Sequence, residues 1–61
     1  MNNADKIREC FRIEAKHPDD CTKEEMIFVR DLWKTGMPQK YLDYCDKVGN
    51  YVDFDEYFSN I

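Results

Sequence analysis

Residues 22–49 read TKEEMIFVRDLWKTGMPQKYLDYCDKVG, and the order of caps and breakers in this stretch predicts two consecutive helices. Thr22 and Glu25 have the spacing of a capping box, in which the Thr22 hydroxyl accepts from the third helical amide and Glu25 returns a bond to the amide of the cap residue. Gly36 and Gly49 can each adopt the left-handed conformation that ends a helix. We therefore expect one helix before Gly36 and a second helix between the two glycines.

The apolar residues of these two helices recur at a helical spacing. At about 100° per residue, each helix gathers its apolar side chains on one face, and Pro38 fits the first turn of the second helix. The predicted inner faces consist of Phe28, Val29, Leu32 and Trp33 in the first helix, and of Tyr41, Tyr44, Cys45 and Val48 in the second. Each helix thus has one face that another element must cover.

The segment before this unit predicts a helix over residues 4–16, with Asn2 or Asn3 as its N-cap. His17 ends this helix, because the residue before a proline avoids the helical region. The apolar stripe of the helix would consist of Ala4, Ile7, Phe11 and Ala15.

Residues 53–56, DFDE, repeat the capping-box pattern after the unit, with Asp53 as the cap of a short last helix. One side of that helix would carry Phe54, Tyr57, Phe58 and Ile61. No strand-like alternation occurs in the 61 residues. We therefore predict one all-α domain over residues 1–61, a small bundle of four short helices.

Two known families resemble parts of this arrangement. The two helices joined at Gly36 resemble a helix-turn-helix, with Met37 after the turn and Leu42 and Cys45 at inward positions of the second helix. Residues 36–61 also resemble ubiquitin-associated (UBA-like) domains in the order of a Gly-Met loop, a helix, a Gly-Asn turn and a last helix. The loop, Thr-Gly-Met here, departs from the Met-Gly-Phe/Tyr loop with which that family contacts ubiquitin, so this resemblance implies a compact helical corner only.

The length of the chain allows only one small core. A chain of 61 residues buries only about 60% of the surface that its unfolded form exposes, so its stability depends on a few large side chains. We expect Phe11 and Trp33 to be core anchors. Three cysteines cannot all pair within one chain, and their low number indicates reduced thiols and not a disulfide framework.

The charge of the chain is unevenly distributed. The net charge is −4; residues 1–40 contain eight acidic and eight basic side chains, whereas residues 41–61 contain five acidic side chains, one basic side chain and six of the nine aromatic rings. Acidic groups among rings suit a basic or mixed protein surface better than phosphate. No apolar run reaches half of the ~20 residues of a membrane helix, and the N-terminus lacks the apolar stretch of a signal peptide. We therefore expect a cytoplasmic protein with no membrane partner.

We predict a binding face on the last two helices. Outward acidic side chains would steer a basic partner, and partly buried rings would anchor it. The predicted residues are Asp43, Asp46, Asp55 and Glu56, with Tyr41, Tyr57 and Phe58 as possible anchors. Ile13 and Ile27 lie nearly opposite the apolar stripes of their helices, so they are a second possible contact with another protein or another copy of the chain. The alternative is that the rings form the core and the acids a solvated face.

The sequence offers little for catalysis or metal binding. His17 is the only histidine, and a bundle this small has little concavity for a substrate, so we do not expect an enzyme. Cys10, His17, Cys21 and Cys45 are the ligand types of a zinc site, but only His17 and Cys21 are closely spaced. We predict that the chain folds without metal and has no cofactor.

The function that these patterns favour is stoichiometric binding: a regulator, inhibitor or adaptor of a larger protein with a basic surface. The alternative is a helix-turn-helix transcription regulator that works as a dimer. A recognition helix needs basic side chains near phosphates. The helix after Gly36 offers Lys40 and Lys47 but also Asp43 and Asp46, so nucleic acid is the less favoured partner.

Overall fold

The computed structural model describes residues 1–60, which form four α-helices and one short 3-10 helix without any β-strand. The elements are α1 (Asn3–Glu14), η1 (Pro18–Asp20), α2 (Lys23–Lys34), α3 (Met37–Val48) and α4 (Phe54–Ser59). The prediction of an all-α bundle of four short helices is confirmed. The 3-10 helix is an element that the sequence reasoning did not include.

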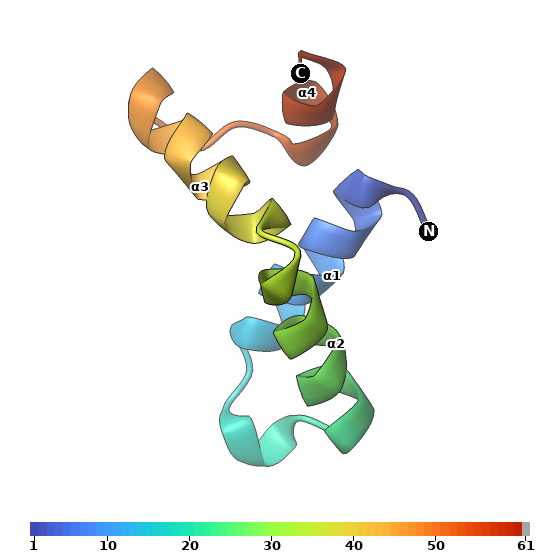
Figure 1. Cartoon of the computed structure of the whole chain (residues 1–61). Helices are drawn as coiled ribbons and strands as arrows, with labels where there is room; N and C mark the ends of the chain where they lie inside the picture. The colour runs from blue at the N-terminus through green and yellow to red at the C-terminus, as the bar shows by residue number, and fades with distance from the viewer. Residues whose placement is uncertain (61) are drawn as a thin grey trace.

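The helices form an elongated body in which α1 packs against both α2 and α4, and α2 contacts α3. Figure 1 shows α2 and α3 following one another along the molecule, with α4 near the N-terminal part of α1 and η1 at the far end. The principal extents are 33 × 21 × 17 Å. One end of the molecule therefore consists of η1 and the start of α2, and the other of α4 and the end of α3.

The capping box at the start of α2 forms as predicted. The Glu25 amide donates to Thr22 Oγ1 at 3.1 Å, and the Thr22 amide donates to Glu25 Oε1 at 2.9 Å. Gly36 and Gly49 flank α3 with φ angles of 79° and 96°, in the left-handed region that a side chain would disfavour. These local signals explain why the boundaries of α2 and α3 follow from the sequence.

The outer helices agree with the sequence in part. Asn2 caps α1, since its Oδ1 accepts from the Asp5 amide at 2.8 Å, but the helix ends at Glu14 and not near Lys16. Asp53 caps α4 by accepting from the Asp55 amide at 2.8 Å. Within the described residues, the reciprocal half of a box is present only at α2.

The core is a cluster of buried side chains contributed by all four α-helices. Its members are Ile7, Cys10, Leu32, Tyr41, Cys45 and Tyr57. Phe11 and Trp33, the expected anchors, are only partly buried and pack against this cluster. The Trp33 indole donates to the Glu14 carboxylate, so one edge of the ring stays at the surface. Tyr41 takes the central place instead, with ring centroids of Phe54 at 4.8 Å and Tyr57 at 5.4 Å.

The prediction that Ile13 is exposed is wrong. Ile13 is 3% exposed, and Ala15 of the expected stripe is exposed. The physical reason is that the chain folds back over the end of α1: the Cys21 thiol, just after η1, donates to the Ile13 carbonyl at 3.7 Å. A helix face that reads as outward is thus covered by a segment whose path the helical period does not reveal.

Two other positions differ from the predicted faces or lie beyond them. Val48 is the last residue of α3 and is 46% exposed, although it was expected on the inner face. The end of α3 projects away from α1 and α2 in Figure 1, so no helix of that pair covers this turn. Ile61, expected on the inner side of α4, lies outside the described residues.

Candidate partner-binding surface

The four acidic residues predicted for the binding face are all exposed. Asp43 and Asp46 lie on α3, and Asp55 and Glu56 lie in the first turn of α4. Asp43 Oδ1 accepts from Gln39 Nε2 at 2.9 Å within α3. The carboxylates therefore belong to two elements that lie at the same end of the molecule (Figure 1).

Ion pairing differs sharply between the two halves of the chain. In the first half, Lys16 Nζ lies 2.8 Å from Glu25 Oε2, and Glu9 pairs with Arg12. In the second half, only Asp55 has an ionic partner among residues 1–60, since Arg8 Nη2 lies 3.3 Å from its Oδ2. The carboxylates without an ion pair in this part of the chain are Asp43, Asp46, Asp53 and Glu56. Their charge is consequently available to a partner.

The rings predicted as anchors lie mainly in the core. Tyr41 is 4% exposed and Tyr57 is 5% exposed, so each ring can offer only a small part of its surface to a partner. Both rings belong to the buried core cluster, whereas partly buried anchors were predicted. Phe58 is partly buried, with its centroid 4.8 Å from that of Tyr57, and retains some free surface.

Burial also keeps the Tyr41 hydroxyl protonated. Desolvation and the neighbouring Cys45 raise the pKa of Tyr41 to about 12. Its hydroxyl therefore stays protonated and donates to the Val52 carbonyl at 2.6 Å. This hydrogen bond ties α3 to the loop that leads into α4.

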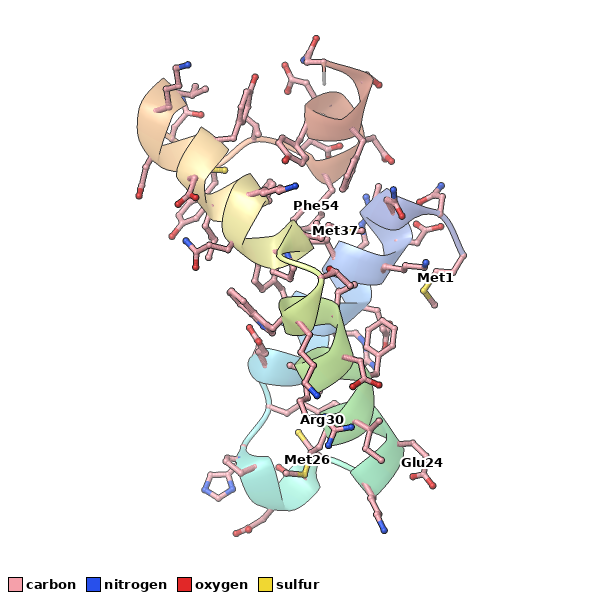
Figure 2. All side chains as sticks on the ribbon, viewed as in Figure 1. Met1, Glu24, Met26, Arg30, Met37 and Phe54 are labelled. Carbon is pink, nitrogen blue, oxygen red and sulfur yellow. The ribbon has the colours of Figure 1, made fainter. Side chains whose placement is uncertain are left out.

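The structure separates Ile13 and Ile27, the two residues of the second predicted contact. Ile27 on α2 is 38% exposed, whereas Ile13 is buried, so the two do not form a shared apolar face. Met26, the neighbour of Ile27, is 56% exposed. Figure 2 places Met26 at the opposite end of the molecule from Phe54 of α4. The structure therefore does not join Ile27 to the acidic surface.

Sequence reasoning missed Tyr51, which is 84% exposed and lies in the loop between α3 and α4. A signal was present, because Tyr51 follows Gly49-Asn50, where the helical period ends and no inner face is available to a ring. Tyr51 borders two hollows. One of about 220 Å³ is also lined by Cys45, Asp46, Gly49 and Asn50, and one of about 380 Å³ by Phe11, Tyr41, Leu42 and Phe54.

Arg8 shows how this end of the molecule holds a cation. Its Nη1 donates to Asp5 Oδ1 at 2.7 Å, and its Nη2 donates to Asp55 Oδ2 at 3.3 Å. Its Cζ lies 5.6 Å from the centroid of the Phe54 ring. A carboxylate and an aromatic face both attract a guanidinium group. A ring and two acids therefore bind an arginine within the chain itself.

The thiols and the histidine occupy structural positions. Burial and the nearby Glu14 carboxylate raise the pKa of the Cys10 thiol to about 11, which disfavours the reactive thiolate. The Cys21 thiol donates to backbone carbonyls, including that of His17 at 3.7 Å, and His17 Nδ1 accepts from the Asp19 amide at 3.2 Å. Across residues 1–60, no three His, Cys, Asp or Glu side chains gather closely enough to hold a metal ion.

No known protein family, curated protein or solved structure matches this chain. The resemblances to helix-turn-helix and UBA-like domains therefore stay predictions. Within residues 1–60, no helix combines the length and the apolar character that crossing a membrane requires.

Proposed function

We propose that the chain is a small acidic helical interaction module that binds a larger protein through a basic surface on that protein, and so regulates, inhibits or recruits it. The observation that carries this proposal is the set of exposed acids on α3, on α4 and between them that have no ionic partner within residues 1–60. Lys47 is the only base among residues 41–61. An excess of one charge at one end of a protein attracts a partner of the opposite charge.

Stoichiometric binding suits the structure better than catalysis does. The thiol of Cys10 is buried, and Cys21 is engaged with backbone carbonyls through its Sγ. His17 is largely exposed, on a short 3-10 turn. A nucleophile requires an activating base within hydrogen-bond reach in a pocket that holds substrate, and these groups do not offer that combination.

The test is a comparison of association rates after charge reversal. Wild-type protein immobilised on a support captures partners from the native cell lysate, and a captured protein is then purified for kinetic measurements. We expect Asp43→Lys with Asp46→Lys to slow association strongly at low salt, and to matter less as salt rises, because steering is screened over about 10 Å at 0.1 M salt. The melting temperature should change by only a few degrees, since both side chains are exposed.

A matched control has the same change in net charge at the other end of the molecule. Asp19 and Asp20 are exposed acids of η1, so Asp19→Lys with Asp20→Lys tests whether position or total charge matters. Equal slowing by both double variants, or by neither, would contradict a binding face on α3 and α4. Retention on heparin with a steep salt dependence would instead indicate a nucleic-acid binder; we expect the protein, at net charge −4, to flow through.

A further inference from the structure

We propose that Tyr51 and Asp46 receive an arginine side chain of the partner, and that the apolar hollow that Tyr51 also borders receives a large apolar residue next to that arginine. This inference rests on the proposed function and specifies the chemistry of the segment that is bound. The partner would therefore present an exposed arginine beside a leucine-like residue, in an extended stretch of chain.

The first observation is the exposure of Tyr51. The ring is 84% exposed, whereas every aromatic residue within α3 and α4 is buried or partly buried. The chain is short of core, yet this ring contributes little to it. Tyrosine is enriched in interfaces because it offers a large rigid surface with a polar tip. Tyr51 is therefore the ring most available to a partner.

The second observation is the smaller of the two hollows that Tyr51 borders. Its lining includes Asp46, which has no ion pair within residues 1–60, and the Gly49-Asn50 turn. A guanidinium group can donate two N–H groups to one carboxylate while its plane stacks on a ring. Lysine offers only a point charge, so a site with one ring and one carboxylate favours arginine.

The third observation is the arrangement around Arg8, which uses the same groups within the chain. There a phenylalanine ring lies 5.6 Å from the guanidinium carbon, and a carboxylate of α4 lies 3.3 Å from a guanidinium nitrogen. Tyr51 and Asp46 provide a ring and a carboxylate without an arginine partner among the described residues. The molecule thus holds one arginine of its own and presents the parts for a second.

The apolar hollow supplies the other half of the recognition. It is lined by Phe11, Tyr41, Leu42 and Phe54 together with Tyr51 itself. Tyr51 borders both hollows, and successive side chains of an extended segment point in opposite directions. A segment that lies along Tyr51 can therefore direct an arginine into one hollow and its apolar neighbour into the other. Burial of an apolar side chain here would slow release, whereas the acids mainly affect the approach.

The experiment uses three peptides of about twelve residues and equal charge as probes. The first contains Arg-Leu pairs, the second Lys-Leu pairs and the third Arg-Ser pairs. Binding to the full chain is followed through the amide chemical shifts in ¹⁵N-edited NMR spectra. We expect the Arg-Leu peptide to bind about 2- to 5-fold more tightly than the Lys-Leu peptide, as for an exposed cation–π contact. The largest shifts should occur at Gly49, Asn50 and Tyr51.

Variants at exposed Tyr51, Asp43 and Asp46 and at partly buried Leu42 then test the two contacts. Tyr51→Ala should abolish the preference for arginine, and Tyr51→Phe should retain it because the ring remains. Asp46→Asn should weaken binding of the Arg-Leu peptide more than Asp43→Asn does, although both variants remove one exposed charge from α3. The Arg-Ser peptide should bind more weakly than the Arg-Leu peptide, and Leu42→Ala should reduce that difference.

The outcomes separate this inference from the proposed function. Equal affinity for the arginine and lysine peptides, or unchanged binding by Tyr51→Ala, would overturn the inference even if the acids of α3 still steer the partner. Arg-Leu binding that shifts amides of α2 and η1 instead of the α3–α4 loop would overturn it as well. A different result would contradict the proposed function: charge reversal on α3 would leave the rate of association with the captured partner unchanged.

Discussion

The half of the molecule formed by α1 and α2 and the half formed by α3 and α4 are stabilised by different interactions. In the first half, carboxylates are used locally: Glu25 completes the capping box and accepts from Lys16, and Glu14 accepts from Trp33. In the second half, aromatic rings make the contacts, with Tyr57 packed against Tyr41, Tyr44 and Phe58. Among the acids of that half, only Asp55 has an ionic partner within residues 1–60.

This difference indicates which carboxylates are available to contact a partner. A side chain that caps a helix or pairs with a base is committed to the fold, and a partner could use it only by displacing that contact. No carboxylate of α3 or α4 except Asp55, which contacts Arg8, pairs with a base within residues 1–60. Asp43 accepts only from Gln39 of its own helix, and Asp53 caps α4. Carboxylates such as Glu14 and Glu25 therefore serve structure in the first half, whereas the carboxylates of α3 and α4 are mostly available for binding.

The largest expected effect is the loss of the Tyr41 ring, which joins the two halves: its centroid lies 6.0 Å from that of Phe11 on α1 and 4.8 Å from that of Phe54 on α4. Tyr41→Ala should lower the free energy of unfolding by about 3–5 kcal/mol, as for other large buried rings, which approaches the whole stability of a small domain. Tyr41→Phe should cost about 1–3 kcal/mol, because it leaves the Val52 carbonyl without its donor. Urea unfolding followed by circular dichroism measures both changes.

Tyr51→Ala is the matched control for that experiment, because this ring is exposed and lies outside the core cluster. Its free energy of unfolding should stay within about 0.5 kcal/mol of the wild-type value. A large loss of stability in this variant would mean that the rings of the second half do not divide into core and free surface as described.

The capping box provides the next effect, confined to the first half. Thr22→Ala should lower the free energy of unfolding by about 0.5–2 kcal/mol, because the Glu25 amide loses its acceptor. Thr22→Ser keeps a hydroxyl and should restore most of that loss. Amide hydrogen exchange should show faster opening in the first turn of α2, while α4 remains as protected as in the wild type; equal loosening of α4 would argue against a local role.

Glu25 adds a pH dependence to the same half. Hydrogen bonds from Lys16 and the Thr22 amide lower the pKa of Glu25 from 4.5 to about 2. A lowered folded-state pKa stabilises the protein above pH 4.5 and the contribution disappears as the pH falls toward 2. The melting temperatures of wild type and Glu25→Gln should therefore differ at neutral pH and converge near pH 2. Glu24→Gln, in the same exposed turn, is the control and should track the wild type.

The smallest effect concerns the charge contact between the halves. Arg8→Met should change the free energy of unfolding by about 0–1 kcal/mol, because the Arg8 and Asp55 side chains are both largely exposed. A double-mutant cycle with Asp55→Asn isolates the pair, and its coupling should shrink as salt rises. A cost of Arg8→Met that persists at high salt, with little coupling to Asp55, would point to the Phe54 ring as the main partner of Arg8.

The four α-helices and most of their caps follow from local sequence signals. The Thr22–Glu25 box, the two left-handed glycines and the Asp53 cap are local signals, since each depends on residues a few positions apart. The excess of acids after residue 40 was also readable, because charge counting needs no fold. These features account for the all-α class and for the choice of α3 and α4 as the acidic surface.

Which side chains are buried depends on the tertiary structure and could not be predicted from the helical period. Helical periodicity places Ile13 outward, but the return of the chain through η1 buries it, and Tyr41 and Tyr57 become core because α3 and α4 enclose them. Tyr51 stays exposed because it lies in a loop whose path no periodicity describes. The physical reason is that hydrogen bonds of caps and turns act over three or four residues, whereas burial depends on how segments distant in sequence come together.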